Sequence, residues 1–184
     1  MQQNSPLKFA VVFIVLFLAF YYFNIVFWGV VNPGGYYSPF LAKYLNYISA
    51  LRFVLIHSTE LILKLMGYGT VTNDHELLLA GHGIINVSYS CFGLGVLSFF
   101  AAFVLAYPKP RKRKLIFLIA GILIIEILNV FRFVILALFL SKVNSNNLDH
   151  HTIFNICIYI IISISLFLWV RNDTAAKQHA NTSS

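Results

Sequence analysis

The chain has 184 residues, of which 59% are hydrophobic and only 10% are charged, and its mean hydropathy is +0.80. Soluble domains average about 25% charged residues, so a water-soluble globular protein is excluded. The formal net charge of +7 does not indicate nucleic-acid binding, because its largest basic block, residues 108–114, lies between two apolar runs. We therefore predict an all-α integral membrane helical bundle that forms a single domain over residues 1–184.

Apolar runs predict the membrane spans. The first run is long enough to cross a hydrocarbon core of about 30 Å, and it exceeds the roughly 7–15 apolar residues of a signal peptide. We expect about four to five transmembrane helices, together with an amphipathic helix and a small non-helical outer cap. The clear spans cover residues 7–28, 91–107, 115–140 and 152–170, and a cytoplasmic tail follows over residues 171–184.

Residues 39–66 have helical periodicity, but charged or ionisable side chains interrupt them. Charges near the centre of a bilayer are costly. We interpret this segment as an amphipathic helix at the outer interface, with an additional true span as the alternative. Glu60 and Lys64 have the i,i+4 spacing of a salt bridge. The interrupting residues are Lys43, Arg52, His57, Glu60 and Lys64.

Residues 67–90 lack helical periodicity. Short runs of β-favouring residues over 69–72, 76–80 and 84–89 are separated by turn-forming residues. The pattern predicts the small outer cap, which delivers the chain to Cys91.

Segment 108–114 sets the predicted orientation, because it contains five Lys or Arg residues and such residues beside short spans stay cytoplasmic. Cys91, at the other end of the preceding span, then faces outward, as do the cap and the loop over residues 141–151. A cytoplasmic N-terminus requires that residues 39–66 do not cross the membrane.

Cys91 is a candidate nucleophile. A lone cysteine is often a small buried hydrophobe, and Cys157, inside an apolar run, is interpreted in that way. Cys91 is instead expected to begin a helix, whose N-terminal amides favour a thiolate, at a depth that water and a peptide can reach. Gly93 follows, and its missing side chain leaves room for another backbone to approach.

Arg132 lies inside the third span, about 26 Å along the helix from Leu115 and therefore in the outer leaflet. An arginine there costs at least about 2.5 kcal/mol, so a functional role is the first hypothesis. Asn129 shares its helical face and is placed to hold the guanidinium. The alternatives are a side chain that extends to the outer headgroups or an ion pair with Glu126.

His150 and His151 open the fourth span, either as part of a helix cap or as a general acid and base, and the periodicity does not select between the two histidines. A metal site built from His82 and these two residues is a further alternative, although no H-E-x-x-H or paired metal-ligand spacing is present. We expect neither a cofactor nor a metal.

Three motifs, taken in order, resemble the exosortase/archaeosortase family, and most of all its compact Bacteroidetes-type members. The resemblance covers residues 65–170. It implies an integral-membrane cysteine transpeptidase or protease of the bacterial cytoplasmic membrane, multi-pass, with its active site facing the periplasm or exterior. The motifs are Cys91-Phe92-Gly93, Asn129-Val130-Phe131-Arg132, and His151 with Asn155 four residues later.

The same resemblance implies the roles of the site residues and the partners. The partners are exported proteins with a C-terminal sorting signal, made of a short motif, a transmembrane helix and a basic cluster, together with membrane lipid; no nucleic acid is expected. The implied catalytic residues are Cys91 as nucleophile, Arg132 as stabiliser of the thiolate or oxyanion and His151 as acid and base, supported by Asn129, His150 and Gly93.

Two other functions compete with this interpretation. A non-catalytic membrane scaffold or transporter-like subunit would use Arg132 and Glu126 as a buried pair and would be indifferent to the loss of Cys91. Metal-dependent hydrolysis at the outer histidines predicts sensitivity to chelators and tolerance of Cys91→Ser.

Overall fold

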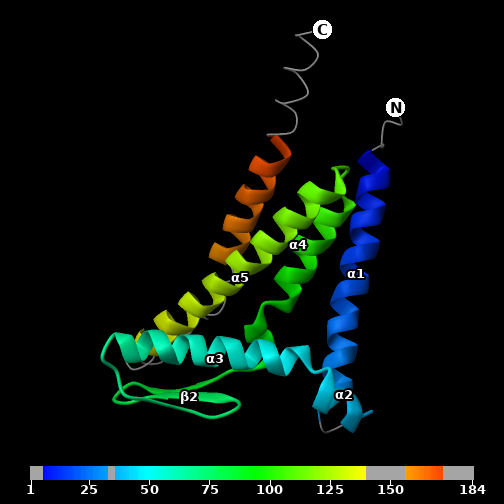
Figure 1. Ribbon diagram of the computed structural model, residues 1–184. Helices are drawn as coiled ribbons and strands as arrows, with labels where there is room; N and C mark the ends of the chain where they lie inside the picture. The colour runs from blue at the N-terminus through cyan, green and yellow to red at the C-terminus, as the bar shows by residue number, and fades with distance from the viewer. Residues whose placement is uncertain (1–5, 33–35, 140–155, 172–184) are drawn as a thin grey trace. The chain divides into compact units, whose positions relative to one another are not determined.

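The structure is a computed structural model that describes residues 6–32, 36–139 and 156–171. The chain forms two compact units, residues 1–145 and 146–184. The first contains all the helices and strands that Figure 1 labels, and the described part of the second is one apolar helix, Ile156–Arg171. Helices make up most of the described chain, so the mostly helical architecture predicted from the apolar runs is present.

Two helices are long and apolar enough to cross a membrane, α1 over Pro6–Val31 and α5 over Arg111–Phe139. Their 26 and 29 residues extend about 39 and 43 Å, compared with about 30 Å of hydrocarbon. α5 begins four residues before the span expected from residue 115. Its first turn forms at once after Pro110, whose carbonyl accepts a hydrogen bond of 3.1 Å from the Lys114 amide.

Helix α4, over Leu94–Ala106, is shorter than the span expected over 91–107, and its 13 residues extend about 20 Å. It starts late because Gly93 adopts a left-handed conformation, with φ of 66°, which interrupts the helix. It ends at Tyr107, whose extended backbone precedes Pro108, because a residue before proline disfavours the helical conformation.

Aromatic and glycine contacts hold α1, α4 and α5 together. Phe9 and Phe13 of α1 pack edge-to-face on Phe103 and Phe99 of α4, with ring centroids 5.4 and 5.3 Å apart. Gly121 of α5 makes room for an aromatic ring of α4, which would lie only 2.1 Å from an added Cβ. Because Phe9 also contacts the ring of Tyr107, the start of α1 lies at the same end of the unit as the basic segment 108–114.

Residues 39–66, expected as one helix, form α2 over Pro39–Tyr44 and α3 over Tyr47–Leu65. The break falls before Asn46, whose side chain caps α3 by accepting a hydrogen bond of 2.9 Å from the Ser49 amide. The salt bridge between Lys64 and Glu60 is confirmed, with a distance of 2.7 Å. Figure 1 shows α3 running crosswise to α1, α4 and α5, and the interfacial position of residues 39–66 stays a prediction.

A three-stranded antiparallel sheet lies between α3 and α4 in sequence, with the order β1-β2-β3. Its strands are β1 over Thr70–Thr72, β2 over Glu76–Leu79 and β3 over Gly83–Asn86. Leu77 and Leu79 are buried while Leu78 between them is exposed, so one face of the sheet joins the hydrophobic core. That core is shared with α3 and with the last turns of α5. The position of the sheet as an outer cap stays a prediction.

The helix Ile156–Arg171 contains the described part of the span expected over 152–170. Cys157, interpreted as a packing residue, is exposed on it. Residues 140–155, with both candidate histidines of the fourth span, and residues 172–184 of the tail lie outside the described part of the chain.

Candidate active site

Cys91 lies in a single 3-10 turn, Tyr89–Phe92 (η1), that connects the sheet to α4. The expectation that Cys91 begins an α-helix is therefore wrong, because Gly93 separates the turn from α4. The Cys91 amide donates to the Ser88 carbonyl at 2.9 Å, and the Ser88 hydroxyl lies 3.5 Å from the Cys91 sulfur. Cys91 is only 1% exposed, so the thiol is enclosed and not open to water as its position in the sequence suggested.

Arg132 projects from α5 to this enclosed thiol. Its guanidinium interacts with the Cys91 side chain both as a hydrogen-bond partner and through its charge. Arg132 is 3% exposed and also lies over the ring of Phe133, 5.7 Å from its centroid. Two residues that are 41 positions apart in the sequence, one from a turn and one from a long helix, are thereby brought into contact.

Asn129, one turn before Arg132 on α5, is buried beside the turn that carries Cys91. Its amide nitrogen donates to the Phe92 carbonyl at 3.4 Å. Asn129 thus contacts the cysteine turn, and its expected role in holding the guanidinium stays a prediction. A Cβ on Gly93 would lie 2.8 Å from the same nitrogen. The room at Gly93 is therefore used by a side chain of this protein, and its left-handed backbone explains why glycine stands there.

A family model described as transmembrane exosortase matches residues 3–170. The chain belongs to the transmembrane exosortase family. Neither a curated protein nor a solved structure matches the chain. Membership of this family makes the protein a membrane protein and implies, in general terms, a membrane cysteine transpeptidase. The match includes all the described residues except Arg171.

The third implied catalytic residue of the exosortase, His151, lies outside the described residues, as do His150 and Asn155. His82, the remaining member of the alternative metal site, lies beside the ring of Tyr68, with centroids 5.5 Å apart. The ring nitrogen Nδ1 of His82 is 3.3 Å from the Ala80 carbonyl oxygen. The metal-site hypothesis therefore stays untested by the described part of the chain.

The ion pair on which the scaffold alternative depends is not formed in the described structure. Neither carboxylate oxygen of Glu126 has a hydrogen-bond partner among the described residues, although both are buried. Asn129, one turn further along α5, approaches this carboxylate without the geometry of a hydrogen bond. Arg132, on the other side of Asn129 along α5, instead contacts Cys91.

Sequence reasoning missed the immediate surroundings of Cys91. Ser88 contacts the sulfur, and Trp28 of α1 packs against the two aromatic rings of the turn, 5.2 Å from Tyr89 and 6.1 Å from Phe92 between ring centroids. Burial raises the pKa of the Tyr89 phenol above its ordinary value, so this ring stays uncharged at neutral pH. A serine three residues before the cysteine was a visible signal, but aromatic residues are too frequent in this chain to be informative.

Proposed function

We propose that this exosortase is a cysteine transpeptidase or protease that cleaves the C-terminal sorting signals of exported proteins at the outer face of the bacterial cytoplasmic membrane. The observation that carries the proposal is the contact between the buried guanidinium of Arg132 and the thiol of Cys91. Membership of the transmembrane exosortase family supports it independently.

The contact supplies the chemistry that a cysteine nucleophile needs. The attacking sulfur must carry a negative charge, and the positive charge of Arg132 lies next to it. The thiolate of Cys91 attacks the scissile carbonyl, and the tetrahedral oxyanion can be stabilised by the same guanidinium in a medium of low dielectric constant. The carbon–nitrogen bond then breaks and leaves a thioester on Cys91.

Departure of the amine requires a proton, which we assign to His151 on the basis of the family resemblance. The same imidazole then removes a proton from water or from an acceptor amine, which attacks the thioester and frees Cys91. Hydrolysis gives a protease and aminolysis gives a transpeptidase, so one site accommodates both outcomes. Asn129 and Gly93 act as positioning residues, because they hold the turn that carries the nucleophile.

The burial of Cys91 adds a requirement to this mechanism. With the side chain only 1% exposed, a substrate can reach the sulfur only after neighbouring groups move aside. Exclusion of water from the free enzyme strengthens the interaction between Arg132 and the thiol. It also protects the thiol from reagents in the absence of substrate, so alkylation of Cys91 should be slow until substrate is bound.

The decisive experiment compares two cysteines of the same chain. An exported reporter is fused to the C-terminal sorting segment of a protein from the same genome, and its processing is followed by immunoblotting. Cys91→Ala should abolish processing and Arg132→Lys should reduce it at least about a hundredfold, because lysine lacks the forked donors of the guanidinium. Cys157→Ala, at an exposed cysteine, should process normally. Full processing by Cys91→Ala would refute the proposal.

The proposed orientation places segment 108–114 in the cytoplasm and the sheet outside, as the positive-inside rule requires. Because Cys91 is buried, it is a poor target for a labelling reagent. The orientation is therefore tested with single cysteines introduced at exposed positions, in a variant that carries Cys91→Ala and Cys157→Ala. A membrane-impermeant maleimide should label Val71→Cys, at a position that is 68% exposed, in intact cells. Lys112→Cys should label only after the membrane is breached. The reverse pattern would overturn the orientation.

A further inference from the structure

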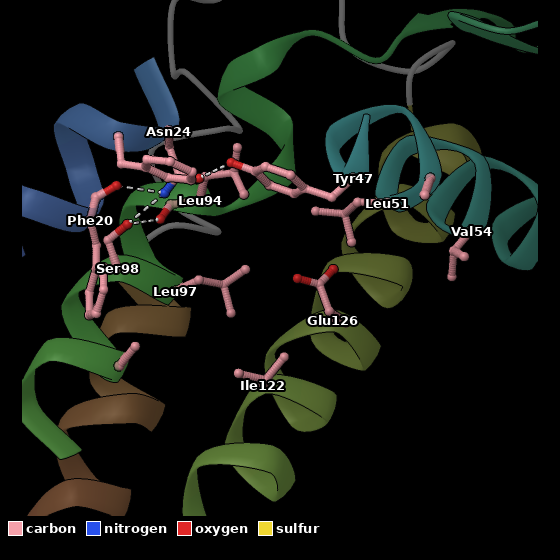
Figure 2. A pocket seen from close by; sticks show the side chains of 13 residues that line it. Phe20, Asn24, Tyr47, Leu51, Val54, Leu94, Leu97, Ser98, Ile122 and Glu126 are labelled. Atoms are coloured by element: carbon pink, nitrogen blue, oxygen red, sulfur yellow. Dashed lines mark hydrogen bonds between the residues drawn. The ribbon is translucent and has the colours of Figure 1, made fainter. Parts of the chain in front are cut away.

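A groove of about 580 Å³ lies between α1, α3, α4 and α5, deeper along α5 than Arg132. Its walls are largely apolar, and Figure 2 shows Glu126 and Ile122 pointing from α5 into this space, opposite Leu97 of α4. Leu94, which directly follows Gly93, also lines the groove. The groove therefore begins three residues after Cys91 in the sequence and continues along α4 away from it.

A closed set of hydrogen bonds occupies the opposite wall. The Tyr47 hydroxyl donates to the Asn24 side-chain oxygen, and the Asn24 amide donates to the Ser98 hydroxyl at 3.0 Å and to the Phe20 carbonyl at 2.9 Å. Ser98 in turn donates to the Leu94 carbonyl at 2.7 Å. Every donor of this set is engaged within the set, as the dashed lines of Figure 2 show in part.

Glu126 is therefore left without a donor in its own groove. Both of its oxygens are buried, and neither has a hydrogen-bond partner among the described residues. The other side chains that line the groove are apolar, apart from the three polar residues whose donors are already used. Burial of an unsatisfied carboxyl group costs several kcal/mol or forces it to stay protonated, so the site is complete only when an occupant brings a polar group.

We infer that this groove binds the transmembrane helix of the substrate and that Glu126 hydrogen-bonds a hydroxyl or amide side chain of that helix. The inference rests on the proposed function, because a sorting signal must lay its helix beside α4 when its scissile bond reaches Cys91. The groove is too small to enclose a helix, and its volume suits the side chains along one helical face.

The positions along α5 predict where the substrate carries its polar residue. Glu126 precedes Arg132 by six residues, which is about 9 Å along the helix axis. A substrate helix that runs alongside α5 covers the same depth in about six residues. A Ser, Thr, Asn or Gln is therefore expected about six residues beyond the bond that Cys91 attacks, on the side of the basic cluster.

Photocrosslinking tests the occupancy of the groove. A photoreactive amino acid replaces Ile122, which lines the groove, or Leu123, its neighbour at almost the same depth, which is 58% exposed. Both are placed in the full chain with Cys91→Ala, so that the reporter is bound but not cleaved. The Ile122 position should capture the reporter through its transmembrane helix, and the Leu123 position should not. Capture of lipid only, or of the enzyme's own helix Ile156–Arg171, at Ile122 overturns the inference.

A double-mutant cycle tests the polar contact. With Cys91 intact, Glu126→Leu should slow reporter processing about three- to tenfold, the range of a single interhelical hydrogen bond in a membrane. Replacement of the polar residue of the reporter helix by Leu should slow it equally, and the two changes together should slow it no further. Glu126→Gln, which can still donate and accept, should stay within about twofold of the parent.

These outcomes separate the inference from the proposed function. Processing that needs Cys91 but shows fully additive effects at Glu126 and at the reporter residue overturns the inference and leaves the proposed function intact. Processing that persists in Cys91→Ala refutes the proposed function, and the inference fails with it.

Discussion

Gly93→Ala is the substitution for which the structure gives the most specific prediction of a change in stability. It alters the residue that connects the cysteine turn to α4. Gly93 has a φ of 66°, and an added Cβ would lie 2.8 Å from the amide nitrogen of Asn129. The new methyl group therefore meets a buried side chain that has little freedom to retreat. Asn129 must shift, and its hydrogen bond to the Phe92 carbonyl is lost with the shift.

The expected cost has two parts. A residue with a Cβ in the left-handed conformation costs about 1–2 kcal/mol relative to glycine. Loss of the Asn129 hydrogen bond adds about 0.5–1.5 kcal/mol, toward the lower end because its length is 3.4 Å. Gly93→Ala should therefore lower the free energy of unfolding by about 1.5–3 kcal/mol.

Gly95→Ala is the matched control, two residues further along the chain. Its Cβ would meet only the Tyr21 ring, at an ordinary contact distance of 3.8 Å. Because alanine favours helix over glycine, this variant should be as stable as the parent or up to about 1 kcal/mol more stable. Unfolding of both variants is measured in micelles by titration with a denaturing detergent, and reporter processing is measured in cells.

A double variant separates the two contributions. Asn129→Ala removes the side chain that the Gly93 methyl group would strike, so Gly93→Ala should cost less in that background, with the backbone contribution of about 1–2 kcal/mol remaining. Equal stability of Gly93→Ala and the parent would refute the reasoning, because both the left-handed φ and the close approach of Asn129 would then be of no consequence.

Two further predictions concern a contact between α4 and α5 and the salt bridge between Lys64 and Glu60. Gly121→Ala places a Cβ 2.1 Å from the Phe100 ring, so it should destabilise the protein by about 1–3 kcal/mol in the same detergent titration. Gly29→Ala, inside α1 with nothing within 4 Å, should be as stable as the parent or up to about 1 kcal/mol more stable. The hydrogen bond from Lys64 holds the pKa of Glu60 below its ordinary value. The stability that this pair contributes is therefore fully present above the ordinary pKa of a glutamate and is lost as the pH falls through the lowered pKa. The melting temperatures of Glu60→Gln and the parent should accordingly converge in acid.

The long helices could be predicted from the sequence because an apolar run of more than 20 residues has few alternatives. α1 and α5 appear close to the expected positions, and only the ends differ. The β-strands were also visible, because short runs of β-favouring residues are separated by turn residues. The buried face of β2 was not visible, because Leu77, Leu78 and Leu79 are consecutive and only the structure shows that Leu78 is exposed. Apolar runs and turn residues predict these elements because they depend only on the period and length of a local stretch of sequence.

The start of α4 could not be predicted in the same way. Phe92, Gly93 and Leu94 continue an apolar run, and nothing in its period shows that Gly93 turns left-handed. At this left-handed residue the side chain of Asn129 approaches closely from α5, a contact between residues 36 positions apart. The burial of Cys91 also depends on packing between residues that are far apart in the sequence, so it cannot be predicted from the residues around Cys91.

The placement of Arg132 is better explained by chemistry than by stability. A buried guanidinium is costly, and a carboxylate is the partner that best offsets that cost. Glu126 stands on the same helix, yet its oxygens remain without partners in the described structure while Arg132 reaches the thiol of Cys91. A nucleophile site needs the cation at the sulfur, and it leaves the acid free for another task. Asn129, which contacts the cysteine turn, lies between Glu126 and Arg132 along α5.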